Sequence, residues 1–406
     1  KYVSALGAAQ GVIDRGREIH ADDLVASAML TRGTVLQLAG NAKEGNAQLA
    51  EATWVALRAH LDQLASKCAL ENAMAQAEHA DSLPIAQLWL DLATATAGRT
   101  PNPYVEMQVL ETRGAIEAGR GELAAAIATH TRGLEAARAL YGANKPEIWG
   151  AENQLAATMA RAGAWVAATP HFEHALALRE AAVGPDHPNV ALILSNLGAC
   201  YDRAGEGMKA LAAFKRAFAI REKTYGPNSP FLISTLNNLA DFEMRHGELA
   251  AALVDIEHAK TIAVRVPGKS NPLYHVIGTT YAEVLGRSSK PTEARAAFDE
   301  ILVLEHGLSS PELGTTLEAR GNFELAEHKW ADAAKFEEQS IKAYEAIGGP
   351  EHLALWSPLA GLAAARRQLN PKADVKPLLD RAIAIGTKAQ ISADDMNPIR
   401  DARAKL

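Results

Sequence analysis

The sequence predicts an all-α fold built from a repeated helix pair, and three observations support this prediction. Similar segments begin at prolines 42 residues apart, namely Pro146, Pro188, Pro230 and Pro272. Apolar residues within each segment recur three, four and seven positions apart, which is the helical period, and no alternating pattern of comparable length competes. About one residue in five is alanine, which favours helices and allows close contacts between them.

The same spacing extends the array in both directions. Pro103 lies 43 residues before Pro146, and Pro311 follows Pro272 after 39 residues. Leu353 stands another 42 residues on, in the slot that the prolines hold in the other segments. An internal period of this length is the mark of a repeat architecture, in which each unit packs on its neighbours.

Each segment carries the same landmarks in the same order. A small residue marks the first helix, where another helix must approach closely: Ala156, Gly198, Ala240, Ala282, Gly321 and Ala363. A glycine ends that helix at Gly163, Gly205 and Gly247, as expected of a left-handed helix terminus. An alanine opens the second helix at Ala168, Ala210, Ala252, Ala294 and Ala333, and a large apolar residue follows four positions later at Phe172, Phe214, Ile256 and Phe298.

These landmarks resemble the tetratricopeptide repeat, a helix–turn–helix unit with a basic length of about 34 residues. The longer stretches LREAAVGPDHPNVALILSNLG and IREKTYGPNSPFLISTLNNLA look like the 42-residue type found in kinesin light chains and in many bacterial signalling proteins. The resemblance implies an all-α, right-handed superhelical solenoid of about nine helix–turn–helix units.

The repeat pattern predicts four regions along the chain. Residues 1–22 form an N-terminal capping helix, and residues 23–102 form degenerate helix pairs that depart from the consensus. Seven units of about 42 residues follow at 103–387. Residues 388–406 are a polar C-terminal cap or a frayed end. No shift in composition marks a separate domain, so we expect one continuous solenoid.

Composition and charge exclude several classes of function. The 41 Lys and Arg against 48 Asp and Glu give a net charge of −7, so no overall basic field is present to hold nucleic acid. Two cysteines far apart in the sequence, Cys68 and Cys200, fit a reducing compartment, so we expect a cytoplasmic location. We also expect Cys200 to be buried. No stretch predicts membrane insertion. The chain begins at Lys1 and not at Met, so we expect it to be part of a longer polypeptide.

The motifs that might carry chemistry have simpler interpretations. The segment AVRVPGKS fits a permissive phosphate-binding loop that includes Lys269, but it falls where neighbouring units have an inter-repeat turn. His171 and His174 share a helix face, yet they supply two of the three or four ligands that zinc needs. No nucleophile elbow, HExxH, CxxC or kinase catalytic motif occurs. We therefore expect no catalysis, no metal and no cofactor in this chain.

The inner surface of the solenoid provides the candidate binding residues, because the resemblance implies that first helices line the ligand groove. One slot near the end of the first helix carries an arginine in four consecutive units, and adjacent slots carry amides: Arg161, Arg203, Arg245, Arg287, Asn153, Asn196, Asn237 and Asn238. These side chains could bind a protein or peptide partner with acidic groups. The arginines could equally complement the negative end of each helix dipole, and the asparagines could bridge stacked helices. Both interpretations stay open.

The overall pattern also resembles the C-terminal region of bacterial serine/threonine protein kinases of the myxobacterial type. Its marks are a poorly conforming N-terminal part with AEATWVALRAHLDQLA, followed by repeats with GPDHP loops. That resemblance implies a regulatory, partner-recruiting region with a kinase domain before Lys1. The same repeats occur in free-standing peptide receptors or adaptors and after nucleotide-binding switch ATPases, so both alternatives remain.

Overall fold

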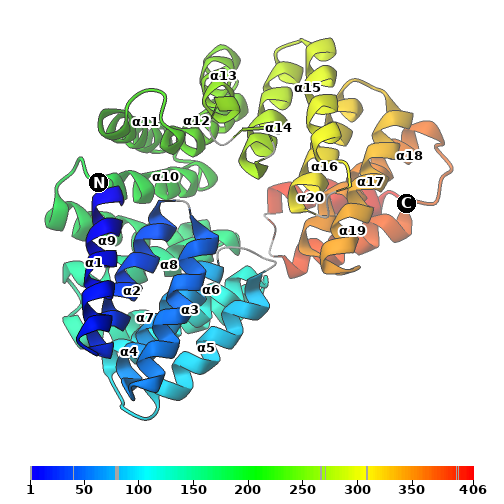
Figure 1. Cartoon of the computed structure of the whole chain (residues 1–406). Coiled ribbons are helices and arrows are strands. Elements are labelled where there is room, and N and C mark those ends of the chain that lie inside the picture. Colours follow the sequence, from blue (N-terminus) through cyan, green and yellow to red (C-terminus); the bar gives the residue numbers. More distant parts are fainter. Residues whose placement is uncertain are drawn as a thin grey trace. The chain divides into compact units, whose positions relative to one another are not determined.

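The computed structural model describes residues 2–39, 41–77, 82–265, 268–269, 271–307, 310–389, 391 and 393–406. This part of the chain contains twenty α-helices and no strand (Figure 1). The predicted all-α fold is therefore confirmed. Contacts divide the chain into two compact units, residues 1–184 and residues 185–406, and each is described by itself.

The first unit is a run of helices joined by short turns. Its helices are α1 (Tyr2–Glu18), α2 (Asp22–Leu38), α3 (Ala42–Arg58), α4 (Asp62–Ala77), α5 (Leu83–Ala97), α6 (Pro103–Gly119), α7 (Leu123–Tyr141), α8 (Trp149–Arg161) and α9 (Trp165–Val183), with a 3-10 turn η2 (Pro146–Ile148) before α8. After α1, which covers the predicted leading helix, they pack as the pairs α2–α3, α4–α5, α6–α7 and α8–α9.

The second unit continues the same arrangement. Its helices are α10 (Pro188–Arg203), α11 (Gly207–Tyr225), α12 (Ile233–Arg245), α13 (Leu249–Arg265), α14 (Pro272–Arg287), α15 (Pro291–Leu304), α16 (Pro311–Ala326), α17 (Trp330–Gly348), α18 (Trp356–Leu369), α19 (Lys376–Lys388) and α20 (Ala393–Ala404), with 3-10 turns η3 (Pro230–Leu232) and η4 (Leu353–Leu355). Five pairs run from α10–α11 to α18–α19. Met396 and Ile399 of α20 are buried in the core of this unit.

The recurring prolines begin first helices or the 3-10 turns that lead into them. Proline suits this position because its missing N–H would have no helical partner there. The residue before the proline caps the helix in several units: Asn102 Oδ1 accepts from the Tyr104 N–H at 3.0 Å, and His187 Nδ1 accepts from the Asn189 N–H at 3.1 Å. The sequence LREAAVGPDHP thus ends α9 and begins α10 with a capped N-terminus.

The turn between the two helices of a pair requires a left-handed residue. Gly163, Gly205 and Gly247 have φ of 80°, 80° and 83°, which confirms the predicted terminus. Where glycine is missing, the backbone keeps the same geometry: His20, His60, Ser289 and His328 all have φ between 54° and 58°. Tertiary packing therefore fixes this turn even where the local sequence opposes it.

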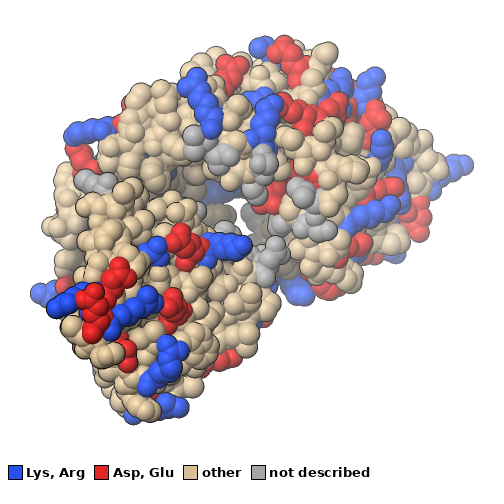
Figure 2. Space-filling model, viewed as in Figure 1, with Lys and Arg blue, Asp and Glu red and all other residues tan. Residues whose placement is uncertain are grey.

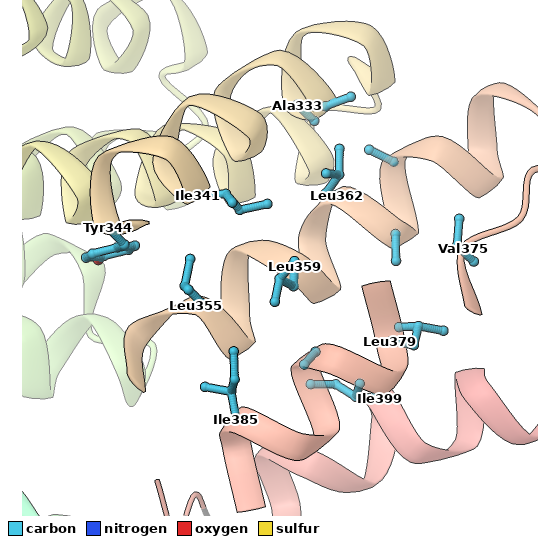
Figure 3. Packing of buried hydrophobic residues seen from close by; sticks show 14 of the residues in the cluster. Ala333, Ile341, Tyr344, Leu355, Leu359, Leu362, Val375, Leu379, Ile385 and Ile399 are labelled. Atoms are coloured by element: carbon cyan, nitrogen blue, oxygen red, sulfur yellow. The ribbon is translucent and has the colours of Figure 1, made fainter. Parts of the chain in front are cut away.

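The core of each unit forms where the small residue of a first helix meets the large residue of the second. Gly198 lies against Phe214, and a Cβ added to this glycine would lie 2.8 Å from the Phe214 ring. Figure 3 shows the C-terminal core, in which Leu355, Leu359 and Leu362 lie between α17 and α19. Such contacts confirm the predicted burial of the repeat landmarks.

Two pairs place an ionisable side chain in the slot of the large apolar residue. His130, 42 residues before Phe172, is 4% exposed, and Glu337, 39 residues after Phe298, is fully buried. Each packs against the small-residue slot of a first helix, His130 on Gly114 and Glu337 on Gly321. A polar group in such a site costs free energy unless it is satisfied.

Both cysteines are free and fully buried. Burial raises the pKa of Cys68 to about 12 and that of Cys200 to about 11. The predicted buried state of Cys200 is confirmed. No helix in the described ranges is long and apolar enough to cross a bilayer.

Candidate partner-binding surface

The first helices of consecutive pairs contact one another within each unit. In the first unit α4 contacts α6, and α6 contacts α8; in the second, contacts link α10, α12, α14, α16 and α18 in order. The faces of these helices form the candidate surface. Figure 2 shows basic and acidic side chains interspersed on the visible face of each unit, so neither unit presents a field of one sign on that face.

The first unit contains a cavity of about 430 Å³ on this surface. Its polar lining is His130 of α7 with Asn153, Gln154, Thr158 and Arg161 of α8, and its remaining lining comes mainly from small residues of α6 and the end of α4. The structure therefore brings two of the predicted residues, Asn153 and Arg161, to one cavity. Because α8 contributes a helical stripe, residues three, four and seven positions apart face the cavity together.

The two amides of this cavity are incompletely satisfied. Asn153 Oδ1 and Gln154 Oε1 are buried and have no hydrogen-bond partner in the described part of the chain. Arg161 is exposed and donates from Nη2 to the carbonyl oxygen of Ala118 at 2.9 Å. That bond ties α8 to the end of α6, so Arg161 has a structural role across neighbouring pairs.

His130 forms the floor of the cavity from the second helix of its pair. Burial lowers the pKa of His130 to about 4, so the imidazole is neutral at pH 7. Its burial excludes most solvent, and a Cβ at Gly114 would lie 2.6 Å from its Cε1. Sequence analysis did not identify His130 as a candidate. The signal that could have identified it is a histidine at the position that Phe172 holds in the next repeat, 42 residues later.

In the second unit the arginine slots lie among carboxylates. Arg245 donates to Asp202 and to Asp241, whose Oδ2 lies 2.9 Å from Nη2. Asp202 is on the preceding first helix, so this pair joins α10 to α12. Arg203 and Arg287 are exposed at the equivalent positions. The geometry of Arg161 and Arg245 fits the structural interpretation of the arginines, while their contact with a partner stays a prediction.

The amide slots of the second unit lie half-buried on α10 and α12, at Asn196, Asn237 and Asn238. Asn237 Oδ1 is buried without a partner among the described residues, as is that of Asn153 two repeats earlier. The same slot thus holds an unsatisfied amide oxygen in both units. Helical periodicity alone identified this slot, but it could not show which oxygens lack partners.

A smaller cavity of about 220 Å³ lies between α14 and α16 of the second unit. Threonines and two carboxylates line it, contributed by Thr279, Thr280, Thr315, Thr316, Glu283 and Glu312. Burial, with Asp241 nearby, raises the pKa of Glu283 to about 7, although Arg287 opposes the rise. This part of the surface is therefore acidic, unlike the cavity in the first unit.

The other predicted motifs have structural roles. His171 and His174 contact the buried Glu152 carboxylate, with Nδ1-to-oxygen distances of 2.6 and 2.9 Å. The segment resembling a phosphate-binding loop begins within the last turn of α13, a helix and not a strand, and residues 266, 267 and 270 of it lie outside the described residues. Lys269 Nζ donates to Glu300 Oε1 at 2.5 Å.

Comparison with two solved structures, a Rap protein and the quorum sensor NprR, supports the fold. A Rap protein complexed with competence and sporulation factor has a TM-score of 0.64 at 13% identity, covering 90% of this chain and 98% of its own. The apo form of the quorum sensor NprR from B. thuringiensis has a TM-score of 0.60 at 14% identity, covering 88% and 98%. Repeats assigned to a kinesin light chain of Podospora anserina have a TM-score of 0.44 at 15% identity, covering 51% and 97%.

Sequence comparison identifies the repeats themselves. No curated protein matches the sequence. Two family models, both described as tetratricopeptide repeat, match residues 150–223 and 232–273. These ranges hold α8 to α13 and include the predicted slots of Asn153, Asn196, Asn237 and Asn238. Residues 150–223 and 232–273 therefore carry tetratricopeptide repeats, and the described helices of each unit pack in pairs of the same kind.

Proposed function

We propose that the chain is a non-catalytic scaffold that binds a protein or peptide partner in extended form along the first helices of its repeats. The observation that carries this proposal is the shared slot of Asn153 and Asn237, whose buried oxygens lack partners in the described part of each unit. Leaving such an acceptor unpaired costs about 1–3 kcal/mol, so stability does not explain its presence in both units. A side-chain amide both donates and accepts, which matches the two polar groups of a peptide backbone.

The relatives support binding as the type of function. The fold is shared with a Rap protein complexed with competence and sporulation factor. In a solenoid, each pair buries its faces against its neighbours, and the stacked first helices leave an extended surface for a partner. In the first unit Arg161 suits an acidic group of a partner, and in the second unit the lining near Glu283 suits a basic one. The proposed location of this scaffold is the cytoplasm.

The test is a selection of short peptides from a random display library on the full chain. Asn153→Ala and Asn237→Ala are each expected to weaken a selected peptide roughly two- to tenfold, as for loss of one neutral hydrogen bond. Gln87→Ala is the matched control, because Gln87 lies on the second helix α5 and donates to Asp91 at 2.8 Å. Selection of no peptide, or equal affinity for all three variants, would refute the proposal.

We also propose that this scaffold is the regulatory region of a bacterial serine/threonine protein kinase. The support is the resemblance of its GPDHP repeats and degenerate N-terminal pairs to such regions. An antibody against this chain should detect an endogenous polypeptide tens of kilodaltons above 43.2 kDa, with HRD and DFG motifs upstream. A mass near 43.2 kDa would replace this assignment with a stand-alone receptor or adaptor. Upstream ATPase motifs would indicate a switch ATPase.

A further inference from the structure

We infer that the cavity between α18, α19 and α20 in the second unit binds a fatty acid, a carboxylate at the end of a straight hydrocarbon chain. The cavity has a volume of about 910 Å³ and a mainly apolar lining. Small-molecule sites have volumes of about 300–1,000 Å³ and a lining of the same kind. The inference goes beyond the extended-partner proposal, because it assigns a small ligand to a site that includes the tail helix α20.

The cavity arises where the tail helix meets the last helix pair. Successive first helices contact one another from α10 to α18, whereas α20 packs on the second helix α19. The face of α18 that lines the cavity carries the small side chains of Ala360, Ala363 and Ala364. Because alanines fill little of the space between two helices, a cavity and not a close helix crossing lies between α18 and α20.

The inner wall of the cavity is part of the hydrophobic core. Val375 and Leu379 at the start of α19 and Ile399 of α20 line the cavity and belong to one buried cluster (Figure 3). Ala402 lies three positions after Ile399, so both side chains share one face of α20. A wall of this kind favours a hydrocarbon group, because each buried methylene strengthens binding about fourfold.

Two cations of the lining lack partners. Arg367 is half-buried and Lys405 is exposed, and neither forms an ion pair with any residue that the structure describes. The adjacent Arg366 does not line the cavity, and its Nη2 lies 2.8 Å from Glu338 Oε1. The arginine that faces away is therefore paired, whereas the one at the cavity has free donors. A guanidinium with free donors favours an anion, and its fork matches a carboxylate.

The charge balance gives the class of ligand. Asp401 is the one carboxylate among the described residues of the lining, so the two cations leave one positive charge without a counterpart. Gln368 and Asn397 add neutral amides, which donate and accept hydrogen bonds. An apolar cavity with an excess of one positive charge suits a singly charged anion with a hydrocarbon body. It disfavours a cation with the same body.

The test is isothermal titration calorimetry of the full chain at pH 7, with ligands below their micelle concentrations. Decanoate should bind saturably at one site per chain, whereas decan-1-ol and decyltrimethylammonium, which have the same chain, should bind at least tenfold more weakly. Octanoate should bind roughly fifteenfold more weakly than decanoate, because it lacks two methylenes.

Paired variants separate the site from a general effect of charge. Arg367→Gln should weaken decanoate roughly tenfold, as for loss of a charge-assisted hydrogen bond. Arg366→Gln is the matched control at the next position and should leave the affinity unchanged. Asp401→Asn should tighten binding of decanoate roughly two- to fivefold, because it removes the one exposed negative charge of the lining.

A third substitution fills the cavity itself. Ala364 is exposed on α18, so Ala364→Phe should abolish decanoate binding without unfolding the chain. Ala250→Phe, at an exposed position of α13, is its control and should bind as wild type does. Equal affinity for decanoate and decan-1-ol would overturn the inference and indicate an apolar face without preference for an anion. Absence of saturable binding, or normal binding by Arg367→Gln, would also overturn it.

Discussion

Glu337→Gln is expected to stabilise the second unit by about 3 kcal/mol at pH 7. Glu337 is fully buried, both of its carboxyl oxygens lack partners in the described part of the chain, and it lies between Gly321 and Gly361. Burial, with a contribution from Glu318, raises the pKa of Glu337 to about 9. The folded protein therefore holds this side chain protonated at pH 7, whereas the unfolded chain ionises it.

The sign of the pH dependence follows from this difference. Between the unfolded pKa of 4.5 and the folded pKa of about 9, unfolding releases a proton, so this group makes the protein less stable as the pH rises. Urea unfolding at pH 5 and pH 8 should give a higher free energy of unfolding for Glu337→Gln than for wild type, and this difference should be larger at pH 8. Glu338→Gln is the control, because Glu338 is 44% exposed in a surface pair with Arg366, and such pairs contribute about 0–1 kcal/mol. Equal effects of the two variants would contradict the buried, protonated assignment.

The repeat could be read from the sequence because its signals are local. Proline at a helix start, glycine in a left-handed turn and small residues at helix crossings each impose a constraint within a few positions. The helix bounds follow these marks closely: α10 begins at Pro188, and Gly205 forms the turn after it. The slots of Asn153 and Asn237 follow from the same periodicity.

The partners of the candidate residues could not be read in this way, because they come from neighbouring helix pairs. Arg245 reaches Asp202 across 43 positions, and Arg161 reaches the Ala118 carbonyl across the same separation. Both arginines also satisfy the pattern expected of residues that bind a ligand. Spacing alone could therefore not show whether they join neighbouring helices or contact a partner. The contact geometry between adjacent first helices therefore decides which groups Arg161 and Arg245 contact.

The boundary between the two units also lacks a sequence signal. It falls at Gly184, yet the loop that follows, GPDHP, matches the GPNSP loop at Gly226 within the second unit. The loop sequence therefore does not mark the division between the two units. The four regions predicted from the sequence stay a prediction.

Glu152→Gln is expected to destabilise the first unit by about 2–3 kcal/mol at pH 7. The Glu152 carboxylate is fully buried on α8 and joins three helices through Arg138 of α7 at 2.7 Å and through His171 and His174 of α9. Burial alone would raise the pKa of Glu152, but hydrogen bonds with His171, Arg138 and His174 outweigh it and lower the pKa to about 2. A neutral amide loses the charge that these contacts stabilise.

The pH dependence should be opposite to that of Glu337. A depressed folded pKa contributes stability above the unfolded pKa of 4.5, and this contribution is lost as the pH falls toward about 2. Wild type and Glu152→Gln should therefore differ most in thermal melting at pH 7 and converge in acid. Glu147→Gln, an exposed carboxylate in the preceding turn η2, is the control and should melt as wild type does. If Glu152→Gln behaved like this control at pH 7, the carboxylate would not hold α7, α8 and α9 together, and the two histidines would be free for another role.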